Sequence, residues 1–265
     1  MKQTNSSLNA KIKKLLPVVA LLIILCFSLF FLNTSPKLVA ENDSGLPLHP
    51  IVAEMLTYLD IHDCRITKIK DYSRLSSFLE SPAISDEDVN AYVENIMETA
   101  GIDNLTTEFL NERYQIDSVE EFYEYAYDKV ADAKKTELIL NSRKEVMQTL
   151  IEQNCTFEFD ENVVAEYAME TVHFYEATAG YGEDDFKAYI IQEFGSEDQF
   201  FDYCYNESLK MIETYLVIGA ITSLEGCSIE GYSSTSTYSE SEIYEFYVKL
   251  EGAFYNLFIQ ADENF

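Results

Sequence analysis

The sequence has few basic residues over most of its length. Of its 18 Lys and Arg residues, five lie within residues 1–40, which contain no acid, so 13 face all 47 acidic residues in residues 41–265, a net charge of −34. Such a surface repels the phosphate backbone, so nucleic acid is excluded as a partner. The charge instead favours solubility and cationic partners.

Motifs for nucleotide binding and covalent catalysis are missing. The chain contains no GxxxxGK[ST] loop, no GxGxxG and no GxSxG. These motifs place backbone amides or a nucleophile where phosphate and acyl chemistry need them. We therefore expect no nucleotide, no cofactor and no enzymatic activity.

Histidines are scarce, which limits the metal sites that the chain can build. The sequence has three: His49, His62 and His173. Glu170 and His173 have the Glu-x-x-His spacing of di-iron helical bundles, but those sites need two such motifs and this chain has one. The triplet 62–64, His-Asp-Cys, is a second arrangement of metal-ligand types. We interpret both as ordinary surface or half-buried residues and predict no metal site.

A calcium loop is also not expected. Asp86, Asp88 and Asn90 match the first positions of such a loop, but no Gly follows at the sixth position. Acids in the first turn of a helix explain this pattern better.

The cysteines do not form a zinc pattern, since no pair lies two to four residues apart. Beyond Cys26 they are Cys64, Cys155, Cys204 and Cys227. Cys204 and Cys227 flank one predicted helix, which would separate them by roughly 34 Å, too far for a disulfide. We expect buried free thiols, with other disulfide pairings as the alternative.

The one long hydrophobic run lies at residues 15–32, LLPVVALLIILCFSLFFL, behind the basic Lys11-Ile-Lys-Lys14. Eighteen uncharged positions after basic residues predict a single transmembrane helix with residues 1–14 in the cytoplasm and the rest outside it. The alternative is a signal segment cleaved after Ala40, which would release a secreted protein.

The stretch 118–154 predicts one long helix, around which we expect the chain to be organised. It has no Gly and no Pro, and Ser118 with Glu121 matches a capping box. At 1.5 Å per residue the helix would be roughly 54 Å long. It must project beyond a compact core or form the spine of that core.

The remaining patterns predict a mainly α, elongated ectodomain with long helical arms and minor β-structure near the start. We expect an edge strand over 64–69 with 72–79 as its partner. Capping residues predict helices that begin after Ser85 and Ser196, and a last helix is expected over 242–259. The expected units are a linker (33–60), a helical domain (61–230), a loop (231–240) and a C-terminal aromatic amphipathic helix (241–265).

One internal similarity links two helix beginnings. SVEEFYEYAY at 118–127 and SEDQFFDYCY at 196–205 both read Ser-x-x-[Glu/Gln]-Phe-aromatic-acid-Tyr-x-Tyr. The aromatic residues span more than one narrow helical face. Either each beginning is packed on both sides, or part of its aromatic surface is open to a partner.

Several ordered motifs resemble the trigger factor family. They are ISDEDVNAY at 84–92, LTTEF at 105–109, SVEEF at 118–122, RKEVMQTLIE at 143–152 and FEFDENV at 157–163. The resemblance covers about residues 65–225. The motif at 84–92 resembles the stretch that precedes the isomerase domain in that family, and the other motifs resemble its C-terminal chaperone region. An extracytoplasmic relative of the SurA type would share the same arrangement of arms. The resemblance implies that the 61–230 domain is a chaperone body of helical arms around a cradle.

The departures from the family are equally informative. Only the few residues 98–105 stand where trigger factor inserts its prolyl isomerase domain, and the chain has no Trp. The ribosome-binding module is replaced by the membrane segment. Prolyl isomerase activity is therefore not expected.

Together these patterns predict a membrane-anchored, extracytoplasmic, ATP-independent chaperone that binds apolar segments of unfolded, newly exported polypeptides. The alternative is a membrane-anchored adaptor whose aromatic helices bind one dedicated partner or self-associate. The predicted client-binding residues are Phe122, Tyr123, Tyr127, Phe200, Phe201, Tyr205, Phe246, Tyr247 and Phe254.

Overall fold

The computed structural model describes residues 38–178, 183–262 and 265, and this part of the chain is mainly helical, as predicted. In chain order the elements are β1 (Leu38–Glu41), α2 (Pro50–Tyr58), β2 (Arg65–Lys70), β3 (Ser77–Leu79), α3 (Asp86–Ala100), α4 (Thr107–Tyr114), α5 (Val119–Thr149), the π-helical turn η1 (Leu150–Asn154), β4 (Cys155–Glu158), α6 (Glu161–Thr178), α7 (Glu183–Phe194), α8 (Glu197–Leu224), α9 (Glu240–Asn256) and β5 (Ile259–Ala261). The expected membrane segment, 15–32, lies outside the described residues. Among those described, no helix has the length and apolar character needed to span a bilayer.

The helix beginnings follow their capping residues. The Ser118 and Ser196 hydroxyls each accept a hydrogen bond from the backbone N–H three residues further on, at 3.1 Å. Both beginnings are confirmed. The expected box at Ser118 is modified, because the Glu121 carboxylate accepts from the Asp117 N–H at 3.2 Å and not from that of Ser118.

A three-stranded antiparallel sheet has the order β1-β2-β4. The strand expected over 64–69 is present as β2. It is central and not an edge strand, and 72–79 is not its partner, so these two parts of the prediction are wrong. Arg65 pairs with Glu158 at one end and Ile69 with Cys155 at the other. Since β4 lies almost 90 residues along the chain, nothing in the local alternation could reveal this pairing.

The last helix ends earlier than predicted. It begins at the Ser239–Glu242 capping box, slightly before the expected 242, and stops at Asn256. The chain then forms β5, which pairs in parallel with β3, and the Ser77 N–H donates to the Phe258 carbonyl at 2.8 Å. The expected helix over 242–259 is therefore wrong at its end, because the backbone pairs with a distant strand.

The main core surrounds α8, and not the long helix α5 as expected. All residues of 216–222 are buried, and α8 packs against α2, α6, α9 and β2. Gly219 of α8 packs directly against α2: its carbonyl accepts a hydrogen bond from the His49 N–H at 2.8 Å, and a Cβ there would lie 2.9 Å from Val52 Cγ1. Only the C-terminal end of α5 contributes, through Val146, Met147 and the following Leu150.

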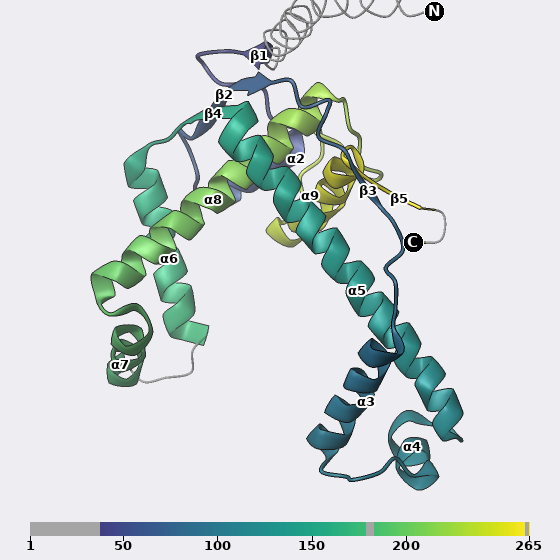
Figure 1. The fold of residues 1–265 in the computed structure, drawn as a ribbon. Helices are drawn as coiled ribbons and strands as arrows, with labels where there is room; N and C mark the ends of the chain where they lie inside the picture. Colours follow the sequence, from purple (N-terminus) through teal and green to yellow (C-terminus); the bar gives the residue numbers. More distant parts are fainter. Residues whose placement is uncertain (1–37, 179–182, 263–264) are drawn as a thin grey trace, which may run out of the picture.

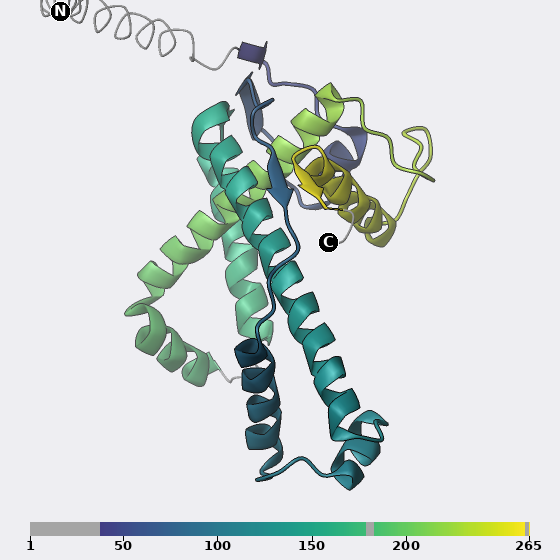
Figure 2. The same cartoon turned by 45° about the vertical axis from the view of Figure 1, so that its right-hand side comes forward.

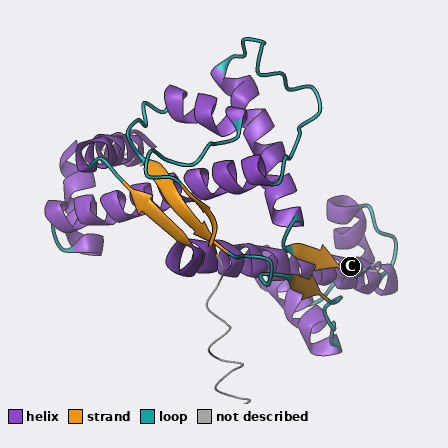
Figure 3. Ribbon diagram, turned by 90° about the horizontal axis from the view of Figure 1, so that it is seen from above, coloured by secondary structure: helices purple, strands orange, loops and turns teal. Residues whose placement is uncertain are grey.

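The segment 33–60 is not a linker where it is described. Residues 38–41 form β1 in the sheet, and Ile51 and Val52 of α2 are fully buried in the main core. The unit expected at 241–265 is not separate either, because Phe254 of α9 lies in that same core. Figure 3 shows the two small sheets at separate places among the helices.

Two helical arms diverge from this core (Figure 1). The first consists of α5 with α3 and α4 near its far end, and α3 runs beside α5 in both side views (Figures 1 and 2). The second consists of α6, α7 and the first half of α8. The described part of the chain is thus elongated and V-shaped.

Candidate functional site

Each arm has a small core of its own, distinct from the main core. In the first arm it consists of Val89, Val93, Leu110, Ile116, Phe122 and Ala126. In the second arm it consists of Phe186, Ile190, Phe200 and Cys204. Each long helix is thus held to the short helix that precedes it by apolar packing near its own N-terminus.

The internal similarity of the sequence has a structural basis in these two cores. Phe122 and Phe200 occupy equivalent positions after the capping serines and are 0% and 4% exposed. Four residues later, Ala126 and Cys204 are both fully buried. Positions i and i+4 lie on one helical face, so the repeated pattern fastens a long helix to its neighbour. The remaining aromatic positions lie on other faces.

The nine predicted client-binding residues divide into three groups. Four are buried and need unfolding to reach a client: Phe122, Phe200, Tyr247 and Phe254. Three are half-buried: Phe201, Tyr205 and Phe246. Tyr123 and Tyr127 are 39% and 48% exposed. The prediction is corrected for the four buried residues. Their rings fill the two arm cores and the packing surface of α9, so a client cannot reach them in the folded protein.

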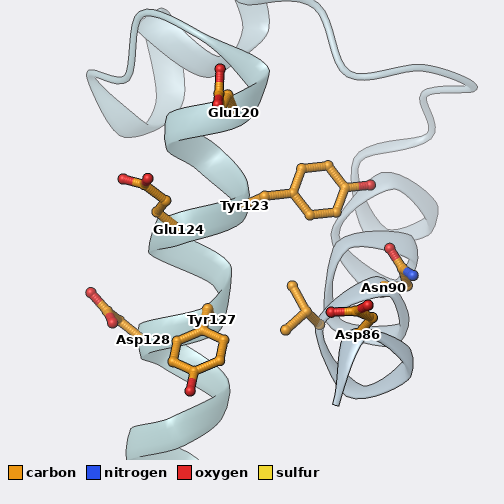
Figure 4. A pocket seen from close by; sticks show the side chains of 8 residues that line it. Asp86, Asn90, Glu120, Tyr123, Glu124, Tyr127 and Asp128 are labelled. Atoms are coloured by element: carbon orange, nitrogen blue, oxygen red, sulfur yellow. The ribbon is translucent and has the colours of Figure 1, made fainter. Parts of the chain in front are cut away.

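Tyr123 and Tyr127 line a groove between α3 and α5 with a volume of about 860 Å³. Figure 4 shows the Tyr123 ring extending from α5 toward α3, with Asp86 and Asn90 on the opposite wall. Further carboxylates line the α5 side: Glu120, Glu124 and Asp128. The structure therefore combines exposed aromatic rings and negative charge in one concave surface.

An ion pair joins the two walls of this groove. Lys134 Nζ of α5 lies 2.6 Å from Asp88 Oδ2 of α3, and the Ser85 hydroxyl also donates to that oxygen at 2.6 Å. The Lys134 ammonium, with the Ser85 donors, holds the pKa of the Asp88 carboxyl well below its usual range. In contrast, Asp86, Glu124 and the other groove carboxylates form no ion pair within the described residues.

The second arm carries exposed aromatic side chains that are not among the nine predicted client-binding residues. Phe174 and Tyr175 of α6 are 65% and 41% exposed, and their ring centroids lie 6.4 Å apart. The ring centroid of Tyr175 lies 5.8 Å from that of the buried Phe200. Tyr203 of α8 is also exposed and packs on Phe194. The available signal was the aromatic pair 174–175: Tyr175 continues the apolar face of Val164, Ala168 and Val172, whereas the adjacent Phe174 lies off that face.

The two metal-ligand patterns of the sequence, Glu170 with His173 and the triplet 62–64, are not part of any cluster of ligands among the described residues. His173 and His62 are both exposed, and no group of His, Cys, Asp and Glu side chains in the described ranges is arranged to hold a metal ion. His49 is buried: the Ile51 N–H donates to its Nδ1 at 3.3 Å, and its Nε2 is 3.2 Å from the Cys227 carbonyl oxygen. It therefore caps α2.

The cysteines after residue 40 are all free. Cys204 is buried in the second arm, and the other three are half-buried. Burial raises the pKa of the Cys155 thiol to about 12. A protonated, half-buried thiol is a poor nucleophile, so Cys155 has a packing role.

Fold and surface together define a mainly helical protein with two arms that expose aromatic side chains. No family model, curated protein or solved structure matches the chain. The resemblance of the sequence motifs at 84–163 to trigger factor therefore stays a prediction.

Proposed function

We propose that this chain is an ATP-independent chaperone that holds apolar segments of unfolded, newly exported polypeptides outside the cytoplasm. The observation that carries the proposal is the exposure of aromatic side chains on both arms, away from the main core. Tyr123 and Tyr127 represent the first arm, and Phe174, Tyr175 and Tyr203 the second.

These side chains suit weak and exchangeable binding. Burying an exposed aromatic ring against an apolar client removes apolar surface from water without requiring a fixed geometry. The net charge of −34 after residue 40, from 13 basic and 47 acidic residues, keeps a loaded complex soluble. Neither contribution needs nucleotide or a catalytic residue.

Residues 15–32 would anchor the protein in a membrane, as their sequence predicts. The register of β1 favours retention of this segment, because Ala40 pairs with Ile69 in the sheet. Cleavage after Ala40 would leave Glu41 as the one remaining residue of β1. We therefore propose a single-pass membrane protein with its folded part outside the cytoplasm.

Substitution of the exposed rings tests the proposal. Tyr123→Ser with Tyr127→Ser, combined with Phe174→Ser, should lower the ability of the full-length chain to suppress aggregation of a chemically unfolded client, because apolar contact area is lost. The matched control is Phe78→Ser with Tyr244→Ser, which removes two rings that are each 62% exposed but lie on β3 and α9. Equal losses in both variants would contradict a role for the arms.

A further inference from the structure

We propose that a hollow between α2, α8 and the beginning of α9 binds a small, soluble quaternary ammonium compound. The inference goes beyond the proposed chaperone function and does not depend on it, because the hollow lies on the main core and not on either arm. It is carried by the aromatic lining of the hollow, by its one carboxylate and by the packing that holds the lining in place.

The hollow is large enough for a small molecule. Its volume is about 390 Å³, within the range of about 300–1,000 Å³ that is usual for small-molecule sites. Met55 and Ile243 line it and are 5% and 1% exposed, so its inner surface is apolar. Leu59, which directly follows α2, is half-buried and extends this surface. A ligand in the hollow therefore buries part of its own apolar surface.

Three tyrosines from three different helices also line the hollow. They are Tyr58 of α2, Tyr215 of α8 and Tyr244 of α9. Tyr58 and Tyr244 are 44% and 62% exposed, whereas Tyr215 is half-buried. Aromatic rings attract cations through their negative faces, and sites with several such rings bind quaternary ammonium groups. Such a group donates no hydrogen bond, so it needs no dedicated acceptor.

The packing around the hollow holds two of these rings in place. The Tyr58 hydroxyl donates to the Tyr238 carbonyl at 2.7 Å. Tyr215 lies edge-on to Tyr247, with ring centroids 5.4 Å apart. The three helices also pack against one another. The lining is therefore largely preformed, and binding a ligand requires little ordering of side chains.

The charge of the hollow favours a cation. Glu240 is its one charged lining residue, and it forms no ion pair within the described residues. The N-terminus of a helix attracts anions, but the first turn of α9 already carries Glu240 and Glu242. The Ser239 hydroxyl also accepts a hydrogen bond from the Glu242 N–H at 3.4 Å. A cationic ligand therefore complements the hollow, and an anionic one is repelled.

Two related ligands fit less well. A neutral apolar molecule of the same shape would leave the Glu240 carboxylate and the tyrosine faces without a partner. A primary ammonium is strongly hydrated and has three donors to satisfy. Besides the tyrosine hydroxyls, the side chains that line the hollow offer it only Glu240 and Ser241 as acceptors. The hollow therefore favours a quaternary over a primary ammonium.

The test measures binding of three soluble probes to the full-length chain by titration calorimetry. The probes are choline, the neutral alcohol in which carbon replaces the choline nitrogen, and ethanolamine. Choline and the alcohol have nearly the same shape, so a difference between their affinities reports the charge. We expect choline to bind at least about fivefold more tightly than the alcohol. Ethanolamine should also bind less tightly than choline.

Substitutions at two exposed positions separate the ring from the carboxylate. Tyr244→Leu should weaken choline binding about fivefold, whereas Tyr244→Phe should retain it because Phe keeps the aromatic face. Glu240→Gln should weaken choline binding about threefold, the size expected for one exposed ion pair, and leave binding of the alcohol unchanged. The matched control is Glu245→Gln, which removes an exposed carboxylate of α9 that does not line the hollow.

Equal affinity for choline and the alcohol, no binding of choline, or an equal loss in Glu245→Gln would overturn the inference. Phosphatidylcholine vesicles present the same ammonium group on a membrane. Stronger competition by these vesicles than by free choline, per headgroup, would overturn the assignment to a soluble compound. Suppression of client aggregation should be unchanged in Tyr244→Leu, so the proposed function stands or fails separately.

Discussion

At the scale of single residues, aromatic side chains in nearly identical sequence contexts have opposite roles. Phe122 is fully buried in the core of the first arm, where its ring lies 5.1 Å from that of Tyr114, whereas the adjacent Tyr123 faces the groove. A shift of one residue turns a side chain by about 100° around a helix, which is enough to exchange packing for exposure. Buried and exposed aromatic side chains therefore lie next to each other along α5.

Phe122→Ala should loosen the far end of the first arm. Loss of a fully buried Phe costs about 3–5 kcal/mol, and the small core offers few other contacts. Amide hydrogen exchange should show reduced protection in α3 and α4 while α8 keeps its protection. Tyr123→Ala, which removes an exposed ring, is the control. An equal loss of protection in that variant would contradict the assignment of these two roles.

His49 should make the stability of the main core depend on pH. Burial lowers the pKa of its imidazole below 6.5, despite the opposing hydrogen bond to the Cys227 carbonyl. The unfolded chain then binds more protons between this lowered pKa and 6.5, so His49 stabilises the fold above pH 6.5 and loses that contribution as the pH falls. Protonation of Nδ1 also removes the acceptor for the Ile51 N–H.

His49→Asn keeps a capping acceptor that does not titrate. The free energy of unfolding of the wild type should fall more steeply than that of His49→Asn between pH 7 and pH 5, as measured by urea denaturation. Parallel pH profiles would show that His49 is not the titrating group.

At the scale of elements, the fold depends on how closely α8 approaches α2. Gly219 allows this approach, since a Cβ at this position would lie 2.9 Å from Cγ1 and 3.1 Å from Cβ of Val52. Val52 is β-branched and fully buried, so it has little freedom to move. The position of α8 at the centre of the molecule therefore depends on the absence of a side chain at Gly219.

Gly219→Ala should destabilise the protein by about 1–3 kcal/mol, because the overpacking outweighs the gain in helix propensity. The matched control is Gly252→Ala in α9, where a Cβ meets no atom within 4 Å. That variant should gain up to about 1 kcal/mol. Chemical denaturation measures both changes, and a stabilising effect at both positions would contradict the close packing of α8 on α2.

Helices were predictable from local signals, whereas strands and burial were not. Ser85, Ser118 and Ser196 mark helix beginnings because capping depends on residues three positions apart. The pairing of β2 with β4 and of β3 with β5 depends on segments that are distant in sequence. The aromatic content of the arms was visible, but the exposure of Tyr123 and the burial of Phe200 depend on which face α3 and α7 cover.

At the scale of the whole molecule, two arms diverge from a shared core (Figure 1), and both arms carry exposed aromatic side chains. The arm cores are small and separate from the main core. Small cores with few buried contacts open at lower free energy than large ones. This arrangement suits a protein whose arms adjust to clients of different shape while the core stays folded.

The most direct test of this account is the aggregation of several unrelated unfolded proteins in the presence of the full-length chain, without nucleotide. We predict suppression at near-stoichiometric ratios for all of them, because the arms offer aromatic contacts that do not depend on a particular client sequence. Failure to suppress the aggregation of any client would contradict the chaperone account and favour an adaptor with one dedicated partner.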